Sequence, residues 1–256
     1  MRNVTGDRRA ETFGFEATWR GRFQEFAEDR DDDAGIAGWT KTGLDARVRR
    51  FLGVWDPIRT GEQWLDAGCG AGTYSRRLRD RGASVVGIDY SPLAIRKAAA
   101  RSGGLVTFVV ADVRLLPFRK NSFDGVICFG VTQALSDSAP VVNQLASSVK
   151  PGGVVWIDGL NRYCLVHAVE MLRRRLARRP VHLRYESPGG IKRLMGAAGM
   201  KNVALFWMPI LPGRWRRAQA WVETPLVQFL LRFVPLLGLL GSHAFIVRGE
   251  KSHASL

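Results

Sequence analysis

The chain has 256 residues, 46% of them hydrophobic and 24% charged, a composition that excludes a disordered or fibrous protein. Its formal net charge of +15 favours anionic partners such as phospholipid headgroups, nucleic acid or phosphorylated substrates, although arginine-rich surfaces also arise from genomic base composition. The three cysteines, Cys69, Cys128 and Cys164, have no C-x-x-C spacing, so neither a disulfide framework nor a bound metal is expected.

The N-terminal segment predicts helices rather than a secretory signal. Charged residues stand where a signal peptide needs an unbroken apolar stretch, so a cytoplasmic location is expected, with peripheral contact with a membrane as a variant. Trp19, Phe23 and Phe26 recur at a spacing that suits one helix face, and Ile36 to Phe51 predicts a second helix. Residues 1–60 are therefore interpreted as a helical lid or docking segment, with simple packing onto the rest of the chain as the alternative.

From Gln63 to Asp158, short apolar runs alternate with helical stretches. This alternation is typical of successive βαβ units and predicts a mainly parallel sheet. Ser91-Pro92 indicates one helix start, because serine caps free amide groups and proline fits the first helical turn. Lys150-Pro151-Gly152-Gly153 predicts a turn into the fifth strand. The predicted strands are Gln63 to Ala67, Ser84 to Ile88, Val106 to Val110, Gly125 to Phe129 and Val154 to Ile157.

Beyond Asp158 the regular alternation lapses. Leu160 to Arg179 predicts a basic helix, and Ser187-Pro188 predicts the start of another that Gly199 ends. Lys201 to Trp207 and Ala244 to Arg248 predict two last strands, separated by a long apolar insertion. The expected division is therefore a helical segment, 1–60, and a domain, 61–256, that carries cap insertions at about 160–200 and 208–241.

The strongest indication of function is the run WLDAGCGAG, residues 64 to 72, an apolar strand that enters a glycine-rich turn before a helix near Thr73. Glycine permits a tight turn and lets a ligand approach the backbone, while the helix N-terminus offers free N–H groups and positive partial charge. A ligand that bears a carboxylate suits such a loop. The spacing G-x-G-x-G differs from the G-x-G-x-x-G of dinucleotide-binding proteins.

Acidic residues mark the ends of the first three predicted strands. Asp66 precedes the glycine turn, Asp89 with Tyr90 ends the second strand, and Asp112 with Val113 ends the third. An acid in the place of Asp89 can accept hydrogen bonds from both hydroxyls of a ribose. Because ligands bind at the carboxyl edge of open α/β sheets, the three acids are expected to share one ligand site.

These residues resemble the class I S-adenosylmethionine-dependent methyltransferases, particularly the small-molecule branch that includes ubiquinone and menaquinone biosynthesis enzymes. The similarity spans about residues 60 to 160. Its segments, in the family's order, are LDAGCGAGTYSRRL, VVGIDYSP, VVADVRLLPFRKNSFDGVICFGVTQAL and VKPGG. The resemblance implies a Rossmann-like α/β fold, namely a seven-stranded, mostly parallel sheet with helices on both faces and an antiparallel last strand, here Ser242 to Val247.

The resemblance also implies S-adenosyl-L-methionine as the cofactor and a place for each motif residue around it. The methionyl end would lie at Asp66, Gly68, Gly70 and Gly72, the ribose at Asp89 and Tyr90, the adenine at Asp112 and Val113, and the sulfonium centre at Gly130. NAD binding is the main competing interpretation, since it shares the strand–loop–helix arrangement. The glycine spacing and the acid at position 112 argue against NAD.

Methyl transfer from a sulfonium mainly requires that the acceptor be held near the methyl group, so no catalytic side chain is obligatory. A phenolic or hydroxyl acceptor would benefit from a general base. Tyr163, His167 and Glu170 recur at helical spacings of four and three, so His167 and, after it, Tyr163 are the candidate catalytic residues. A histidine with a structural role is the alternative. Gln133, in a position that is often histidine in such relatives, weakens any acid–base role there.

Basic clusters flank an apolar segment in the last third of the chain. The clusters are Arg173, Arg174, Arg175, Arg178 and Arg179, and Arg214, Arg216 and Arg217 around Trp215. The apolar segment, Pro225 to Leu240, is shorter than the roughly 20 residues of a membrane-spanning helix. This combination fits a peripheral membrane surface, a tunnel for a lipid-like substrate, or a cap helix packed on the sheet.

The sequence therefore predicts an enzyme that methylates oxygen or carbon of a small hydrophobic acceptor, such as a quinone precursor, a polyketide or a lipid-like metabolite. An RNA methyltransferase is one alternative, suggested by the charge. Against it, Gly130-Val131-Thr132-Gln133 stands where many base N-methylating relatives have an Asn-Pro-Pro-aromatic sequence. A non-catalytic module that binds a partner or a membrane is the other alternative. The sequence does not predict an oligomeric state.

Overall fold

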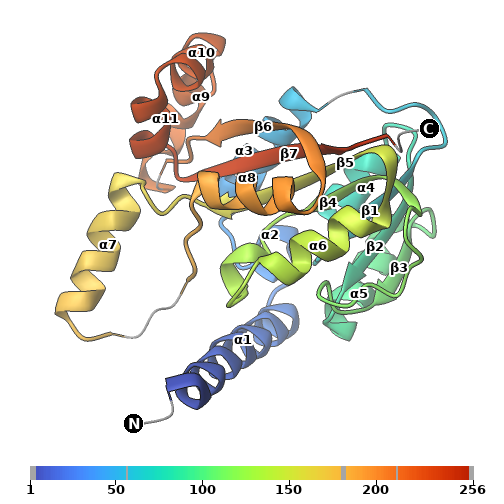
Figure 1. The fold of residues 1–256 in the computed structure, drawn as a ribbon, viewed down its shortest axis with the longest axis horizontal. Helices are drawn as coiled ribbons and strands as arrows, with labels where there is room; N and C mark the ends of the chain where they lie inside the picture. Colours follow the sequence, from blue (N-terminus) through green and yellow to red (C-terminus); the bar gives the residue numbers. More distant parts are fainter. Residues whose placement is uncertain (1–3, 56, 180–182, 212, 254–256) are drawn as a thin grey trace.

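The computed structural model describes residues 4–55, 57–179, 183–211 and 213–253, of which 4–13, 213, 214 and 216 are described by their backbone alone. Its centre is a seven-stranded sheet of order β3-β2-β1-β4-β5-β7-β6 (Figure 1). Strand β7 runs antiparallel to both of its neighbours and the remaining pairs are parallel, which confirms the predicted Rossmann-like α/β fold. The strands are β1 (Gln63–Ala67), β2 (Ser84–Asp89), β3 (Thr107–Val110), β4 (Phe123–Cys128), β5 (Val149–Leu160), β6 (Met200–Met208) and β7 (Ala244–Lys251).

The predicted strands agree with these bounds to within a few residues, except at the start of β5. The expected turn Lys150-Pro151-Gly152-Gly153 lies inside β5, where it interrupts the pairing with β4. Val149 pairs with Phe123, and the pairing resumes at Val154, opposite Gly125. Gly152 has a φ of +78°, so this segment forms a bulge within one strand rather than a turn that precedes it.

Helices cover both faces of the sheet. Each strand therefore contributes to two hydrophobic cores, because successive residues of a strand point to opposite sides. In β4, the buried Val126 and Cys128 belong to a core that includes α6 (Ala139–Ser148) and α8 (Pro188–Ala197). Ile127, between them, belongs to a second core that includes α3 (Lys41–Val54) and α4 (Thr73–Arg79). Helix α5 (Pro92–Ser102) packs beside β2 and β3. The prediction of helices on both faces is confirmed.

The predicted helix starts at two Ser-Pro pairs are confirmed. The Ser91 hydroxyl accepts a hydrogen bond from the Ala94 N–H at 3.3 Å at the start of α5. The Ser187 hydroxyl likewise accepts one from the Gly190 N–H at 3.0 Å at the start of α8. Gly199, with a φ of +81°, separates α8 from β6, as expected for a glycine that follows a helix.

The N-terminal segment forms α1 (Val4–Asp29), α2 (Asp33–Ile36) and α3. The second helix predicted from Ile36 to Phe51 is wrong in its start, because α2 ends at Ile36 and α3 begins only at Lys41. Gly38, with a φ of +70°, and the capping residue Thr40 separate the two helices. Trp19 of α1 is buried and packs against Phe23 one turn further on, with ring centroids 5.3 Å apart and the rings tilted by 41°, so the predicted aromatic face of α1 is present.

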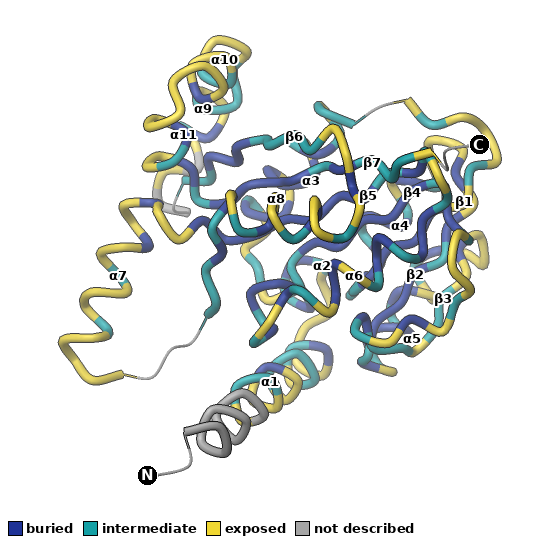
Figure 2. The backbone as a smooth tube through the Cα atoms, viewed as in Figure 1, coloured by how far each residue is buried: buried dark blue, intermediate teal, exposed yellow. Residues whose placement is uncertain are grey.

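Two insertions leave the sheet at its carboxyl edge. Strands β5 and β6 are parallel to each other, since each pairs antiparallel with β7, and the segment after each strand therefore starts at the same edge. Helix α7 (Leu165–Leu176) follows β5, and η2 (Gly213–Ala218), α9 (Gln219–Val222), α10 (Pro225–Phe233) and α11 (Pro235–Gly241) follow β6. Both insertions project from the body and are largely exposed (Figures 1 and 2). Among the described helices, none is long and apolar enough to cross a membrane.

Candidate functional site

The glycine loop after β1 has a backbone shape that side chains rarely allow. Gly68, Gly70 and Gly72 have φ angles of +80°, +51° and +76°, and Gly72 is the residue before the first turn of α4. The N–H groups of Gly68 and Cys69 both donate to the carbonyl of Ile88 at 2.8 Å, which fixes the loop to the end of β2. The loop therefore depends on glycine at all three positions, and at these positions no side chain covers the carboxyl edge.

Asp89, the last residue of β2, connects that strand to the glycine loop. Its carboxylate accepts hydrogen bonds from the Gly70 N–H at 3.0 Å and the Ser91 N–H at 2.9 Å. Burial raises the pKa of Asp89, and the backbone hydrogen bonds oppose that rise only in part. A single carboxylate thus positions the loop and the start of α5 while it lines the cavity described below.

Asp66 of β1 lies beneath the same loop and is 1% exposed. The Ser75 hydroxyl donates a hydrogen bond to its carboxylate at 2.6 Å. Burial raises the pKa of Asp66 to about 7, and the nearby Asp89 adds to the rise. Two carboxyls with raised pKa values therefore lie together at one edge of the sheet, an arrangement that a bound cation would stabilise in its charged form.

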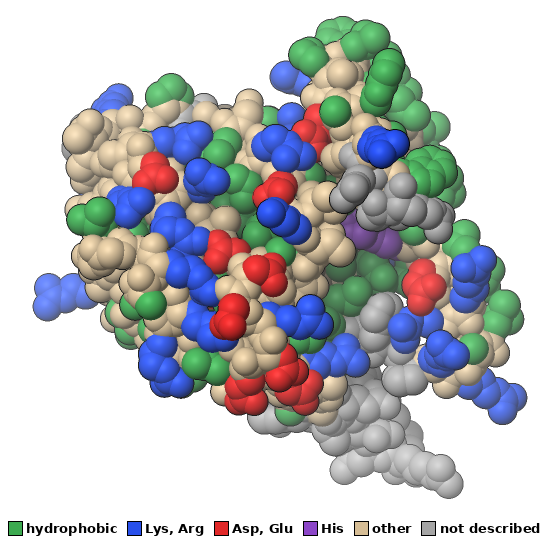
Figure 3. Space-filling view, turned by 180° about the vertical axis from the view of Figure 1, so that it is seen from behind, with side chains coloured by type: hydrophobic (Ala, Val, Ile, Leu, Met, Phe, Trp, Pro, Cys, Tyr) green, Lys and Arg blue, Asp and Glu red, His purple; other side chains and the backbone are tan. Residues whose placement is uncertain are grey.

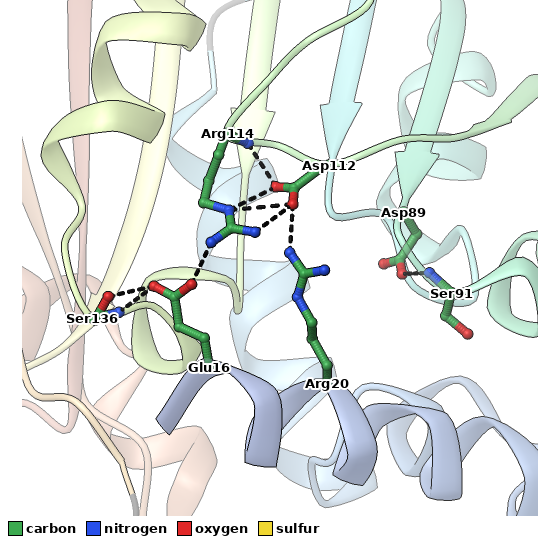
Figure 4. A network of polar contacts seen from close by, with 7 residues as sticks. All are labelled: Glu16, Arg20, Asp89, Ser91, Asp112, Arg114 and Ser136. Carbon is green, nitrogen blue, oxygen red and sulfur yellow. Dashed lines mark hydrogen bonds and ion pairs between the residues drawn. The ribbon is translucent and has the colours of Figure 1, made fainter. Parts of the chain in front are cut away.

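A network of charged groups joins α1 to the end of β3 (Figure 4). Asp112 accepts hydrogen bonds from Arg20 of α1 at 2.5 Å and from the Arg114 guanidinium at 2.6 Å. Arg114 also pairs with Glu16 of α1, and Glu16 accepts a hydrogen bond from the Ser136 N–H at 2.9 Å. Burial alone would raise the pKa of Asp112, but the hydrogen bonds from the two arginines outweigh it and lower that pKa to about 2. These contacts hold α1 across the strand ends.

A cavity of about 1030 Å³, a volume that includes its open mouth, lies between α1 and the carboxyl edge. Seven of the nine residues predicted to bind the ligand line it, namely Gly68, Gly70, Asp89, Tyr90, Asp112, Val113 and Gly130. The other two, Asp66 and Gly72, lie outside the lining. The rest of the wall is largely apolar and aromatic, with Trp19, Phe23, Ile36, Trp39 and Leu44 from the N-terminal segment. The cavity therefore combines polar strand ends with a hydrophobic wall.

Gly130, after β4, is held in place from two sides. The Trp39 indole occupies the space beside it, so that a Cβ on Gly130 would lie 2.6 Å from that ring. The Gly130 N–H donates to the Asp158 carboxylate at 2.7 Å. Asp158 and Arg47 form a buried ion pair at 3.7 Å, and the Arg47 guanidinium lies 4.2 Å from the centre of the Trp39 ring. Burial raises the pKa of Asp158 to about 6, against the lowering effect of Arg47.

The two candidate catalytic residues do not line the cavity. His167 is buried, with Nδ1 2.8 Å from the Asn161 carbonyl and Nε2 2.9 Å from Nδ1 of His243. Burial lowers the pKa of His167 and lowers that of His243 well below its ordinary value of 6.5. Tyr163 is exposed, and Glu170 forms an ion pair with an arginine of α7. The structure therefore brings His167 to a second histidine rather than to the cavity.

Sequence reasoning named Trp19 and Phe23 of the N-terminal segment but missed Glu16, Arg20 and Trp39, which this segment also brings to the site. Glu16 and Arg20 are four residues apart, a spacing that predicts a local pair on one helix face. They bind instead to Arg114 and Asp112, more than 90 residues further along the chain. The only local indication of Trp39 was its aromatic character, and it fell inside the helix predicted from Ile36 to Phe51. Such contacts follow from the fold and have no short motif.

Comparisons with known proteins point to the same region. A family described as methyltransferase domain matches residues 65–157. The ubiquinone biosynthesis O-methyltransferase of Nitrosomonas europaea is 31% identical over 160 residues, which cover 58% of this chain and 67% of that protein. The enzyme of the same name from Idiomarina loihiensis is 29% identical over 155 residues, 57% of this chain, and the match spans only 64% of that relative's length.

A solved structure extends this likeness to most of the chain. It is a chain from the complex of the Haloferax volcanii Trm112 methyltransferase activator with a methyltransferase, with a TM-score of 0.63 and 22% identity. The superposition covers 90% of this chain and 98% of that one. At that identity the likeness concerns the fold.

Proposed function

Because the chain belongs to the class I S-adenosylmethionine-dependent methyltransferases, we propose that it transfers the methyl group of S-adenosylmethionine to a small hydrophobic acceptor. The observation that carries this proposal is the cavity in which the glycine loop, Asp89 and Asp112 face an aromatic and apolar wall. O- or C-methylation of a quinone precursor, a polyketide or a lipid-like metabolite suits such a wall. The names of the two O-methyltransferase relatives favour the quinone precursor.

The described residues fit the methionyl end and the ribose of this cofactor. When bound, S-adenosylmethionine supplies a methyl group on a positively charged sulfur. Gly68 and Gly70 would leave room for the methionyl end, Gly72 would shape the loop from outside the cavity lining, and Asp66 would favour the methionyl ammonium, since a nearby cation stabilises a buried carboxylate. Asp89 would accept from the ribose beside Tyr90. The two backbone hydrogen bonds to Asp89 leave acceptor sites free for the ribose hydroxyls, because the two oxygens of a carboxylate together offer about four acceptor sites.

The adenine would lie at Asp112 and Val113, beneath α1. Because Arg20 and Arg114 already bind Asp112, the adenine amino group would share that carboxylate with them. We therefore interpret residues 1–60 as a lid on the domain 61–256, with Arg20 and Glu16 as its contacts to the strand ends. Release of those contacts would admit the cofactor.

Catalysis would consist mainly of positioning. The Gly130 backbone, fixed by Asp158 and Trp39, would lie beside the sulfonium centre, and the hydrophobic wall would hold the acceptor at about 3 to 3.5 Å from the methyl group and exclude water. The general-base roles of His167 and Tyr163 stay predictions. Their places outside the lining favour a reaction that relies on positioning over one that relies on either side chain.

The function is tested by methyl transfer from labelled S-adenosylmethionine. A prenylated catechol serves as the acceptor, and the same catechol without its prenyl chain and total RNA serve as the competing acceptors. We expect transfer to the prenylated catechol, with a higher KM for the unprenylated one. Transfer to RNA that weakens steeply with salt would favour the RNA alternative. A folded protein that does not bind S-adenosylmethionine would favour the non-catalytic alternative.

Peripheral contact with a membrane forms part of the proposal, because acceptors of this class partition into lipid. The chain's excess of arginine favours such contact, since cytoplasmic leaflets carry anionic lipids. The cytoplasmic location expected from the sequence stays a prediction.

A further inference from the structure

Exposed hydrophobic side chains are concentrated in the two insertions. Among the described residues, all but three of the exposed large hydrophobic side chains lie in residues 163–176 or 215–240, and the three exceptions are Leu105, Val110 and Leu115. We call the exposed hydrophobic surface of these two stretches the apolar edge. Figure 3 shows hydrophobic side chains gathered on the part that Figure 1 labels α9 to α11, with arginine and lysine around them and on α7 below.

Helix α7 turns its hydrophobic stripe outward. Leu165, Val169, Leu172 and Leu176 follow the four-three-four spacing that places side chains on one helix face. A surface helix of a globular protein buries such a stripe, but these four side chains are 58%, 48%, 57% and 76% exposed. His167, on the opposite face, is 5% exposed and fixes α7 to the body. The hydrophobic face of α7 is therefore left without a partner in the described chain.

Helices α10 and α11 repeat this arrangement. Leu226, Phe229 and Phe233 share one face of α10 and are exposed, whereas Leu231 points the other way and is buried. Gly238 of α11 lies so close to the indole of β6's Trp207 that a Cβ there would meet the ring at 2.2 Å. The second insertion is thus docked on the sheet by one side and presents the other side to solvent.

Hydrogen bonds join the two insertions into one surface. The Asn161 side-chain amide, just before α7, donates to the carbonyls of Leu239 at 2.7 Å and Ser242 at 2.9 Å, at the end of α11. His167 of α7 contacts His243, which follows α11. Both insertions leave the sheet at its carboxyl edge, where the cavity also lies. The apolar edge is therefore held in a fixed position relative to the candidate site.

The charges around the apolar edge are almost all positive. Residues 163–179 contain five arginines and one acid, Glu170, and residues 213–240 contain four arginines and one acid, Glu223. Glu170 is paired with Arg174, and Glu223 with Arg49 of α3. Arg173 and other arginines at the end of α7 are exposed beside the hydrophobic stripe. An amphipathic helix with arginines beside its apolar face suits the interface of an anionic bilayer.

We propose that the apolar edge docks this protein on an anionic phospholipid bilayer, with the exposed side chains of α7 and α10 among the lipid headgroups and the arginines at the phosphates. The biological purpose of this docking rests on the proposed function, because it brings the cavity's edge of the sheet to the phase in which a hydrophobic acceptor dissolves. The docking itself can be measured without an acceptor. A second copy of the chain is the competing occupant of this surface.

The test is flotation of the full chain with phosphatidylcholine vesicles, with and without phosphatidylglycerol. We expect binding to the mixed vesicles and little binding to phosphatidylcholine alone. Phe229→Ser with Phe233→Ser, and separately Arg173→Glu with Arg175→Glu, should each weaken binding to the mixed vesicles by about tenfold or more. The matched controls, Leu105→Ser with Leu115→Ser and Arg77→Glu with Arg96→Glu, alter exposed residues elsewhere and should bind as the wild type does.

The outcomes separate this inference from the proposed function. Circular dichroism and thermal unfolding report that each variant is folded, and calorimetry measures its binding of S-adenosylmethionine separately. The docking proposal is overturned if the wild-type protein does not float with the mixed vesicles. It is also overturned if the variant with the Phe229 and Phe233 substitutions binds these vesicles as well as the wild type does. A wild-type dimer in sedimentation velocity that becomes a monomer in that double variant, without vesicle binding, assigns the edge to a second copy. Failure to bind S-adenosylmethionine would count against the proposed function and leave the vesicle result intact.

Discussion

The loops after β1 to β4 and the helices that surround them differ in how directly the sequence specifies them. In the loops, a positive φ requires glycine at Gly68, and a strand end places an acid at Asp89 within reach of the glycine loop. In α1 and α7, function depends on which face of a helix meets a distant partner. The contrast indicates that backbone geometry fixes the glycine loop and Asp89, whereas side-chain contacts between remote segments fix the helices around them.

The strongest test of this contrast is substitution of a loop glycine. A Cβ on Gly68 would lie 2.3 Å from a methyl carbon of Val131, and the φ of +80° is unfavourable for alanine. We expect Gly68→Ala to weaken S-adenosylmethionine binding by about a hundredfold or more in calorimetry. Gly104→Ala is the matched control, because Gly104 has a φ of +75° and open space around it. Equal effects of the two variants would show that crowding at the loop is unimportant.

A smaller effect is expected at the lid. Arg20 and Asp112 form a partly exposed ion pair, and such pairs contribute little free energy. Arg20→Ala should therefore raise the association and dissociation rate constants of the cofactor together by no more than about fivefold, with little change in Kd. Stopped-flow tryptophan fluorescence, to which Trp19 and Trp39 of the cavity wall contribute, measures both rates. Glu25→Ala, at an exposed position on the same helix, is the control. A change in Kd with an unaltered association rate would contradict the role of α1 as a lid.

The pH dependence of cofactor binding tests the buried carboxyls. Asp66 in the free protein has a pKa raised to about 7 by burial, and a bound ammonium would favour its charged form and lower that pKa. Binding below pH 7 should therefore release a proton, so affinity falls as pH falls through 7, by at most about tenfold per pH unit. Calorimetry in buffers of different ionisation enthalpy counts the proton. Asp66→Asn should abolish this release, and its persistence in that variant would assign the proton to another group.

The smallest effect on turnover is expected at His167. The imidazole is buried against Asn161 and His243 and lies outside the cavity lining, so His167→Ala should reduce kcat by less than about threefold while it lowers stability by about 1–2 kcal/mol. A general base would instead contribute about 10² to 10⁴ in kcat, with a change in the pH–rate profile. A loss of that size in a folded variant would restore His167 as the base. His253→Ala, at an exposed position outside the cavity lining, serves as the control.

The sequence predicted the sheet and seven of the residues that line the cavity because each had a local cause. Gly70 lies in a loop that needs positive φ, and Asp112 follows a strand whose end is visible in the apolar pattern. The break between α2 and α3 was missed, although Gly38 marks it, because the flanking segments both have helical patterns. The segment Lys150 to Gly153 was predicted to be a turn, and it forms a bulge in β5, because a glycine such as Gly152 is compatible with either.

The remaining features could not be predicted because they depend on tertiary contacts. The spacing of Leu165, Val169 and Leu172 indicates one hydrophobic face, and the same spacing serves a core and an exposed surface alike. Only the fold shows that His167 is the inward residue of α7. Likewise, Arg20 could have paired within its own helix, and its contact with Asp112 exists because α1 crosses the end of β3.

The central claim is the cofactor site at the carboxyl edge, and calorimetric titration with S-adenosylmethionine of wild type, Asp89→Ala and Asp124→Ala tests it most directly. Asp124 also accepts a backbone hydrogen bond, from Gln63 at 2.8 Å, but it lies at the opposite edge of the sheet. We expect saturable binding by the wild type and by Asp124→Ala, and binding about a hundredfold weaker in Asp89→Ala, because hydrogen bonds to a charged group are lost. A folded wild type without binding, or an Asp89→Ala variant that binds as tightly, would contradict the account.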